Sequence, residues 1–131
     1  MTKDEIASTT QTAVADALGL EEDEVTPDAT LMDELGAESI DLLDILFRLE
    51  RAVGVKIQAS DLADHVQGGI PDDEFGDDAG IITPKGFEQL QKVMPQLTDD
   101  MADKLEAEKV MGLFTVANLT DMVAAKSGAA A

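Results

Sequence analysis

The segment from Ile40 to Gly54 constrains the fold more than any other part of this 131-residue chain. Apolar residues recur along it at helical spacing, and the charged residues fall largely outside that stripe. The stripe consists of Ile40, Leu43, Ile45, Leu46, Phe47, Leu49 and Val53. Gly54 is a natural end for a helix. The pattern therefore predicts an amphipathic helix from about Ser39 to Ala52 that buries one face in a helical core.

An earlier helix is indicated near the start of the chain. Thr2 and Glu5 have the spacing of a capping box, in which the two side chains accept each other's backbone N–H groups. Gly19 is expected to end this helix. Its predicted apolar face consists of Ile6, Ala13, Val14, Ala17 and Leu18.

Four later segments also carry helix signals. Short or regular helices are predicted to begin at Ser60-Asp61-Leu62, at Thr83-Pro84, at Thr98-Asp99-Asp100 and, capped by Thr115, over Val116 to Ala125. Pro84 suits a first helical turn, and Pro95 is expected to end that helix. The apolar positions of the helix that begins at Thr83-Pro84 are Phe87, Leu90, Val93 and Met94. Those of the helix that begins at Thr98 are Met101, Leu105 and Val110, and those of the last helix are Val116, Leu119, Met122 and Val123.

The remaining segments are predicted to lack helix. Glu21 to Glu34 reads as an ordered loop that Val25 and Leu31 anchor to the core, and Gln67 to Gly80 as an exposed loop. A minimal strand pairing is expected between Val55-Lys56-Ile57 and Ile81-Ile82. Residues 127–131 are expected to form a disordered tail.

Charge and composition narrow the function. The chain has 28 acidic and nine basic residues, a net charge of −19, which disfavours nucleic acid and anionic membranes and favours protein partners with basic surfaces. Cysteine is absent, so thiolate catalysis and cysteine metal sites are excluded. The start of the chain lacks the apolar core of a signal peptide, and no run is long enough to span a bilayer, so we expect a cytoplasmic monomer.

The segment Leu35-Gly36-Ala37-Glu38-Ser39-Ile40-Asp41 places a serine between two carboxylates at the predicted start of the Ile40 helix. Ser39 has the residue type and position of a helix N-cap, and Gly36 permits an unusual backbone conformation just before it. A phosphodiester on this serine would gain about 0.3–1 kcal/mol from the positive end of the helix dipole. One interpretation is that Ser39 is an attachment point, and the alternative is that it is an ordinary capping serine.

This segment resembles the phosphopantetheine attachment site of acyl carrier proteins, a Leu-Gly-x-Asp-Ser-Leu-type motif. Glu38 replaces the usual aspartate and Ile40 the usual leucine. The resemblance covers Ile6 to Ile57 and resumes from Phe114 to Lys126. It implies an all-α fold, an acyl-carrier-protein-like four-helix bundle, as one carrier domain over residues 1–126. An extra helical segment would be inserted at about residues 58–112.

The resemblance also implies the function. Ser39 would carry 4′-phosphopantetheine taken from coenzyme A, and the protein would present acyl thioesters without catalysing a reaction. Partners would be a phosphopantetheinyl transferase and acyl-loading, ketosynthase or acyltransferase enzymes with basic docking surfaces. Those surfaces would contact Glu38, Asp41, Asp44 and Glu50. The acyl chain would lie among Leu43, Leu46, Phe47, Leu119 and Met122, which are equally explained as core residues.

The long segment after residue 58 favours fatty acid or specialised lipid biosynthesis. Elongated carrier proteins for very long or unusual acyl chains, including those that serve lipid A acylation, are similar in having an extended region there. The insertion would either flank the acyl pocket or only add core. Arg48 and Arg51 interrupt the acidic face of the Ile40 helix, which predicts reduced exchange with the partners of a housekeeping carrier.

Two alternative functions stay open. One is an aminoacyl or polyketide carrier protein, and the other is an unmodified acidic protein-interaction module, which explains the charge but not the serine motif. Other chemistry finds little support. The acidic run at residues 72–78 does not fit a calcium loop, and His65, the single histidine, has no catalytic partner in the sequence, so no metal or catalytic site is expected.

Overall fold

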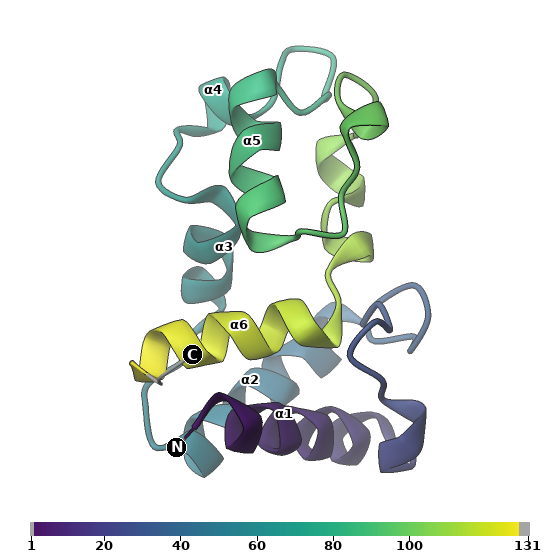
Figure 1. The fold of residues 1–131 in the computed structure, drawn as a ribbon, viewed down its shortest axis with the longest axis vertical. Helices are drawn as coiled ribbons and strands as arrows, with labels where there is room; N and C mark the ends of the chain where they lie inside the picture. Colours follow the sequence, from purple (N-terminus) through teal and green to yellow (C-terminus); the bar gives the residue numbers. More distant parts are fainter. Residues whose placement is uncertain (1, 129–131) are drawn as a thin grey trace. The chain divides into compact units, whose positions relative to one another are not determined.

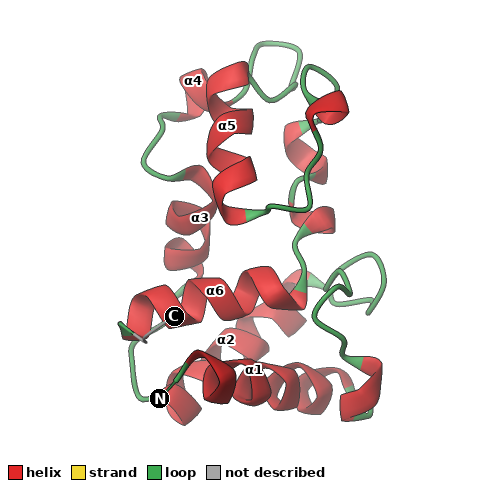
Figure 2. Cartoon of the chain, viewed as in Figure 1, coloured by secondary structure: helices red, strands yellow, loops and turns green. Residues whose placement is uncertain are grey.

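The chain folds into helices joined by loops, as expected (Figure 1). The computed structural model describes residues 2–128, apart from the side chains of Ser39, Ala59 and Met111. Over these residues there are six α-helices and four short 3-10 helices, and Figure 2 shows no strand among them. The contacts divide the chain into two compact units, which we call unit 1 (Met1–Ala59 and Gly112–Ala131) and unit 2 (Ser60–Met111).

Unit 1 contains α1 (Lys3–Leu18), the 3-10 helix η1 (Glu22–Glu24), α2 (Ser39–Val53), η4 (Met111–Leu113) from the boundary, and α6 (Val116–Ser127). Helix α1 packs against both α2 and α6 (Figure 1). Most of the apolar residues predicted to face the core do so, because their aliphatic side chains leave water together, but Ile40, Leu43 and Phe47 of the predicted α2 stripe are exposed. The most deeply buried side chains of the core include Ile6, Val14, Ile45, Leu46, Leu49, Phe114, Leu119 and Met122.

The predicted start and end of α1 are confirmed. The Thr2 N–H donates to Glu5 Oε1 at 3.0 Å, and the Glu5 N–H donates to Thr2 Oγ1 at 3.2 Å. The Thr2 N–H bond to the Glu5 carboxylate, and after it the interaction of that carboxylate with the Thr2 side chain, lower the pKa of Glu5 because they favour its ionised form. Gly19 ends the helix in the left-handed conformation.

The loop from Glu21 to Glu34 is anchored as predicted. Val25 and Leu31 are each only 1% exposed. The same loop also holds the start of α6 through backbone hydrogen bonds. The Leu31 N–H donates to Phe114 O, and the Val116 N–H donates to Ala29 O, both at 3.0 Å. Thr115 caps α6, because its hydroxyl accepts the Asn118 N–H at 3.2 Å.

Unit 2 contains α3 (Ala59–Gln67, starting at the boundary), α4 (Asp72–Phe75), α5 (Pro84–Val93) and the 3-10 helices η2 (Asp99–Met101) and η3 (Ala107–Lys109). The predicted cap of α5 is confirmed, since the Gly86 N–H donates to Thr83 Oγ1 at 3.1 Å. The prediction of an exposed loop over residues 67–80 is wrong for part of that segment. One helical turn, α4, forms there and buries Phe75, because an aromatic ring gains from leaving water.

Two further predictions for this region are wrong. Ile81 and Ile82 do not pair with Val55-Lys56-Ile57; they form isolated bridges with Glu106 and Gly76, respectively. The Ile57 N–H is instead satisfied by Glu50 Oε1 at 2.9 Å. Residues 98–110 form no α-helix but only short 3-10 turns, because Asp103 adopts a left-handed backbone conformation, with φ of 68°, that interrupts any regular helix.

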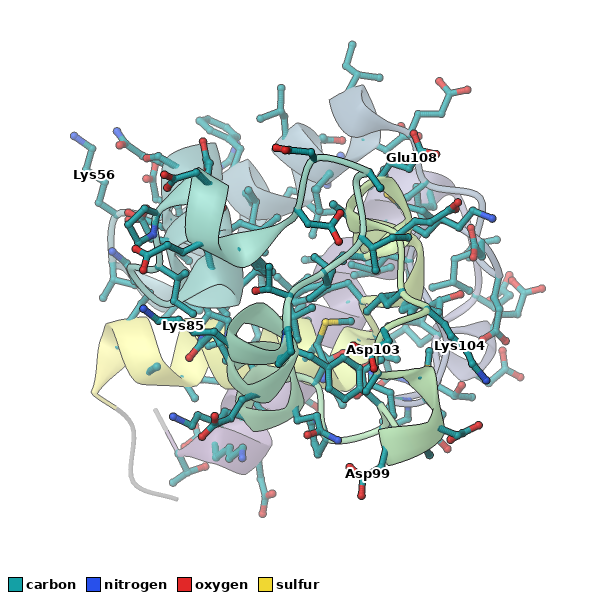
Figure 3. All side chains as sticks on the ribbon, turned by 90° about the horizontal axis from the view of Figure 1, so that it is seen from above. Lys56, Lys85, Asp99, Asp103, Lys104 and Glu108 are labelled. Atoms are coloured by element: carbon teal, nitrogen blue, oxygen red, sulfur yellow. The ribbon has the colours of Figure 1, made fainter. Side chains whose placement is uncertain are left out.

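The exposed side of this segment is charged. In Figure 3 the side chains of Asp99 and Lys104 extend away from the ribbon, and both are exposed. Leu105 and Val110 are buried, which leaves them in the core although no helix carries them.

At the chain's end, α6 continues to Ser127 and is capped by Gly128, so these two residues are not disordered; residues 129–131 of the predicted tail lie outside the described part.

Candidate functional site

The site begins in the loop that leads into α2. Gly36 has a φ of +75°, which favours glycine, and a Cβ placed there would meet no atom within 4 Å. The next residue, Ala37, is buried, and its N–H donates to Leu31 O at 2.9 Å. The loop is therefore tied to the core immediately before the helix begins, so position 39 is fixed by the backbone of unit 1.

The N-cap of α2 is Glu38, and the prediction that Ser39 is the N-cap is wrong. Glu38 has an extended backbone, and its N–H donates to Asp41 Oδ2 at 2.9 Å. This hydrogen bond places the cap one residue earlier, because the side chain three positions after an N-cap is the one that can reach back to its N–H. Ser39 is thus the first residue of α2; its side chain lies outside the described part.

The side chains that follow Ser39 form an apolar strip on the surface of α2. Ile40 is 71% exposed, and Leu43 and Phe47 are each 54% exposed. These three residues lie within one side of the helix at i, i+3 and i+7 spacing. Large exposed apolar residues gathered in this way are typical of a surface that contacts another molecule.

The four predicted docking carboxylates have different surroundings. Glu38 is exposed, whereas Asp41 accepts the Glu38 N–H and Glu50 accepts the Ile57 N–H. Asp44 pairs with Arg48 one turn later, at 3.2 Å. Three of the four acids therefore also stabilise α2 or the turn after it, a role that the sequence analysis did not assign to them.

The residues predicted to line an acyl pocket fall into two groups. Leu46, Leu119 and Met122 are buried in the core of unit 1, whereas Leu43 and Phe47 belong to the exposed strip. Two pockets of unit 1 are lined by other residues: one of about 510 Å³ lies between α1 and α2, and one of about 460 Å³ lies beside the starts of α1 and α6. The acyl pocket stays a prediction.

Arg51 is a surface residue with an aromatic contact that the sequence analysis did not identify. Its guanidinium lies 5.3 Å from the centroid of the Phe47 ring, which is cation–π geometry. The i, i+4 spacing of Phe47 and Arg51 is the sequence signal that points to this contact. Arg48 and Arg51 both line the 510 Å³ pocket between α1 and α2.

Position 39 fits a covalently attached phosphodiester. It is the first residue of a 15-residue helix, where unpaired backbone N–H groups and the helix dipole favour an anion. Its neighbours Glu38 and Ile40 are exposed, and the space beside Gly36 is open. An attached group would therefore extend into solvent without displacing the core.

Within the described residues, no three His, Asp or Glu side chains are grouped so that they could hold a metal ion. None of the described helices has the length and apolar character that crossing a membrane requires.

Comparison with known proteins agrees with the resemblance of the Ser39 segment to a phosphopantetheine attachment site. The family model described as a phosphopantetheine attachment site matches residues 8–67, which includes the Ser39 segment and α2. The chain is similar to the acyl carrier protein of Thermotoga maritima, with 40% identity over 60 residues that cover 46% of this chain and 74% of that protein. The acyl carrier protein of Rubrobacter xylanophilus is 42% identical over 57 residues, 44% of this chain and 70% of that protein.

A further relative is the acyl carrier protein AcpXL of Brucella melitensis, which is 34% identical over 63 residues, 47% of this chain and 68% of that protein. The match covers most of the length of these relatives. The Ser39 segment lies within residues 8–67, which match the family model. On these grounds the chain belongs to the acyl carrier protein family.

Proposed function

We propose that this protein carries acyl groups as thioesters on a 4′-phosphopantetheine arm attached to Ser39. The observation that carries the proposal is the position of Ser39: it begins α2, between exposed neighbours, inside the segment that matches the family's attachment site. The protein itself catalyses no step. When attached, the prosthetic group supplies the thiol that a chain without cysteine lacks.

The chain's own residues prepare the attachment point. The buried Ala37 and the open turn at Gly36 hold the loop, and the hydrogen bond between Glu38 and Asp41 sets where α2 begins. A phosphodiester at position 39 is favoured by the helix N-terminus and disfavoured by the two flanking carboxylates. We infer that these carboxylates serve recognition by a phosphopantetheinyl transferase with a basic surface.

Partner enzymes of acyl metabolism would dock on the same helix. Glu38, Asp41, Asp44 and Glu50 supply negative charge, and the exposed strip of Ile40, Leu43 and Phe47 supplies apolar area. A mixed surface of this kind, an apolar centre with a charged rim, is the usual composition of a protein interface. Electrostatic steering by the net charge of −19 would raise the rate of encounter with basic partners.

The acyl chain is proposed to enter the core of unit 1 beside Leu46, Leu119 and Met122. These side chains are almost fully buried, so entry requires the core to open around the guest. Methionine suits such a core because its side chain is flexible and polarizable. We propose that Leu43 and Phe47 lie at the mouth of that opening, because they are exposed on the same helix as Leu46.

We further propose a carrier domain over residues 1–126 into which residues 58–112 are inserted, and a fatty acid or specialised lipid pathway as its setting. The insertion largely coincides with unit 2, which has its own buried side chains, including Phe87, Leu90 and Met94. A cytoplasmic location and a monomeric state complete the proposal.

The test is the intact mass of the protein after incubation with coenzyme A and a broad-specificity phosphopantetheinyl transferase. We expect the mass to increase by one phosphopantetheine group, and Ser39→Ala to abolish the increase. Ser60→Ala, which removes an exposed serine in unit 2, is the matched control and should load normally. If several transferases fail to load the native chain, the result would favour an acidic interaction protein. Loading that persists in Ser39→Ala would place the attachment at another residue.

A further inference from the structure

The pocket between α1 and α2 gathers positive charge and free hydroxyl groups on an otherwise acidic protein. It is lined by Ser8, Thr9, Thr12, Ala13 and Asp16 of α1 and by Arg48, Arg51 and Ala52 of α2. Arg48 and Arg51 are the two arginines of the whole sequence. Both occur in one pocket, although acidic residues outnumber basic ones by 28 to nine.

The guanidinium of Arg51 is available to an incoming group. Among the described residues, no carboxylate oxygen lies within 4.0 Å of it, and its contact is the face of the exposed Phe47 ring. Stacking on a ring holds the guanidinium plane without using its N–H donors. Among the described residues, the N–H donors of Arg51 therefore pair with no internal acid.

The neighbouring groups add donors and set a limit on charge. Arg48 pairs with Asp44 through Nε, which leaves its terminal nitrogens to the pocket. The hydroxyls of Ser8 and Thr9 donate to no other described residue, whereas the Thr12 hydroxyl donates to Glu22. Asp16 also lines the pocket, so the net positive charge of the pocket is modest. A singly charged carboxylate suits this balance better than a dianionic phosphate, which Asp16 and the overall charge would repel more strongly.

We infer that this pocket is the acid-accepting part of the docking surface of α2, which receives carboxylate side chains of a partner enzyme. The inference rests on the proposed carrier function, because it assumes that partner enzymes dock on α2. Guanidinium groups bind carboxylates through paired hydrogen bonds, and arginine and aromatic residues are enriched at the centres of protein interfaces.

The consequence is a docking surface with two signs of charge. Glu38 and Asp41 lie at the start of α2, and Arg51 lies 12 residues after Ser39, about 18 Å along the helix at 1.5 Å per residue. One interface of ordinary size covers that length. The partner must then present basic side chains near the attachment point and acidic side chains opposite Arg51, an order that an enzyme selected for uniformly acidic carriers does not offer.

The two arginines make the test direct, because the side-chain Nε–H groups give two signals in a proton–nitrogen correlation spectrum of the full chain. Arg48→Gln and Arg51→Gln assign them. The probe is the blocked peptide Glu-Leu-Glu-Leu-Glu, with Gln-Leu-Gln-Leu-Gln as its neutral control. We expect the acidic peptide to cause a saturable shift of the Arg51 signal. Arg51→Gln removes that signal, so its affinity is measured from the backbone amide signals of the pocket residues, and we expect it to be roughly tenfold weaker.

The control variant is Lys92→Gln, which removes one exposed positive charge from unit 2 and reaches the same net charge as Arg51→Gln. It should leave the affinity unchanged, and Arg51→Lys, which keeps the charge but loses the guanidinium fork, should give an intermediate value. The inference is overturned if the Arg51 signal does not shift, if both peptides shift it equally, or if Lys92→Gln weakens binding as much as Arg51→Gln.

Inorganic phosphate is the last probe. A saturable shift of Arg51 at lower concentration than the acidic peptide requires would identify a phosphate site and overturn the docking proposal. None of these measurements uses Ser39, so the pocket can fail while the mass test of the carrier function succeeds, and the reverse outcome is equally visible.

Discussion

Asp41 has a structural role in addition to the recognition role proposed for it. Its carboxylate accepts the Glu38 N–H at 2.9 Å and so determines where α2 begins, beside the proposed attachment point. We predict that Asp41→Ala lowers the free energy of unfolding of unit 1 by about 1 kcal/mol, the usual contribution of a helix-capping side chain. Hydrogen exchange of the α2 amides is the measurement.

Asp44→Ala is the matched control for that prediction, because it removes the same charge from the next turn of α2. Asp44 makes an exposed ion pair with Arg48, and such pairs contribute only about 0.3–0.5 kcal/mol. Equal losses of protection for the two variants would mean that the capping hydrogen bond does not set the start of the helix.

At the residue level, the sequence was informative for most of the caps in which a side chain acts on its neighbours in the chain. The capping box of Thr2 and Glu5 and the caps at Thr83 and Thr115 depend on residues three positions apart, and all three are confirmed. The cap of α2 was misplaced by one residue because serine is a common N-cap, whereas glutamate is not. The exposure of Leu43 and Phe47 depends on how α2 packs, which periodicity alone does not determine.

At the level of elements, α4 and α5 approach each other closely at Gly86. A Cβ on Gly86 would lie 2.5 Å from the Phe75 carbonyl oxygen and 3.2 Å from Ile82 Cγ2. Alanine normally favours a helix over glycine by about 1 kcal/mol, but a clash with a backbone atom requires the two helices to separate. We predict that Gly86→Ala lowers the stability of unit 2 by about 1–3 kcal/mol.

Hydrogen exchange of the α5 amides measures this effect. Lys85→Ala, at the adjacent exposed position, is the control and should change stability by no more than about 0.5 kcal/mol. Increased protection in Gly86→Ala would show that helix propensity outweighs the clash.

Elements with local start and stop signals were predicted correctly, and elements specified by distant contacts were not. Helices α1, α2, α5 and α6 have the predicted identity and nearly the predicted ends. The segment from Thr98 to Val110 has apolar residues at helical spacing, yet it follows bridges and turns because Ile82 donates its N–H to Leu105 O at 2.8 Å. A pairing between residues so far apart leaves no periodic signal in either segment.

At the level of the whole molecule, the net charge of −19 opposes compaction. Ion pairs among the described residues, such as Lys3–Asp121 and Lys85–Glu74, are partly exposed and offset little of this repulsion. We therefore predict that raising sodium chloride from about 0.02 M to about 0.5 M increases the melting temperature by several degrees, because the Debye length falls well below the spacing of most charges.

Thermal unfolding followed by circular dichroism tests this prediction, with sodium sulfate at the same ionic strength as the control. Charge screening should raise the melting temperature with both salts, whereas sulfate adds a separate stabilising effect by exclusion from the surface. A melting temperature that is unchanged or lower in sodium chloride would show that self-repulsion is not a significant term.

The loop over residues 27–31 determines how the last helix is attached to unit 1. Its backbone binds Phe114, Val116 and Ala117 directly, so the start of α6 is specified from within unit 1 and does not depend on the chain that precedes it. Segments of different length and origin can then be exchanged between residues 59 and 112 while the last helix keeps its register. We expect variants that differ only in this segment to keep the same backbone contacts at the start of α6.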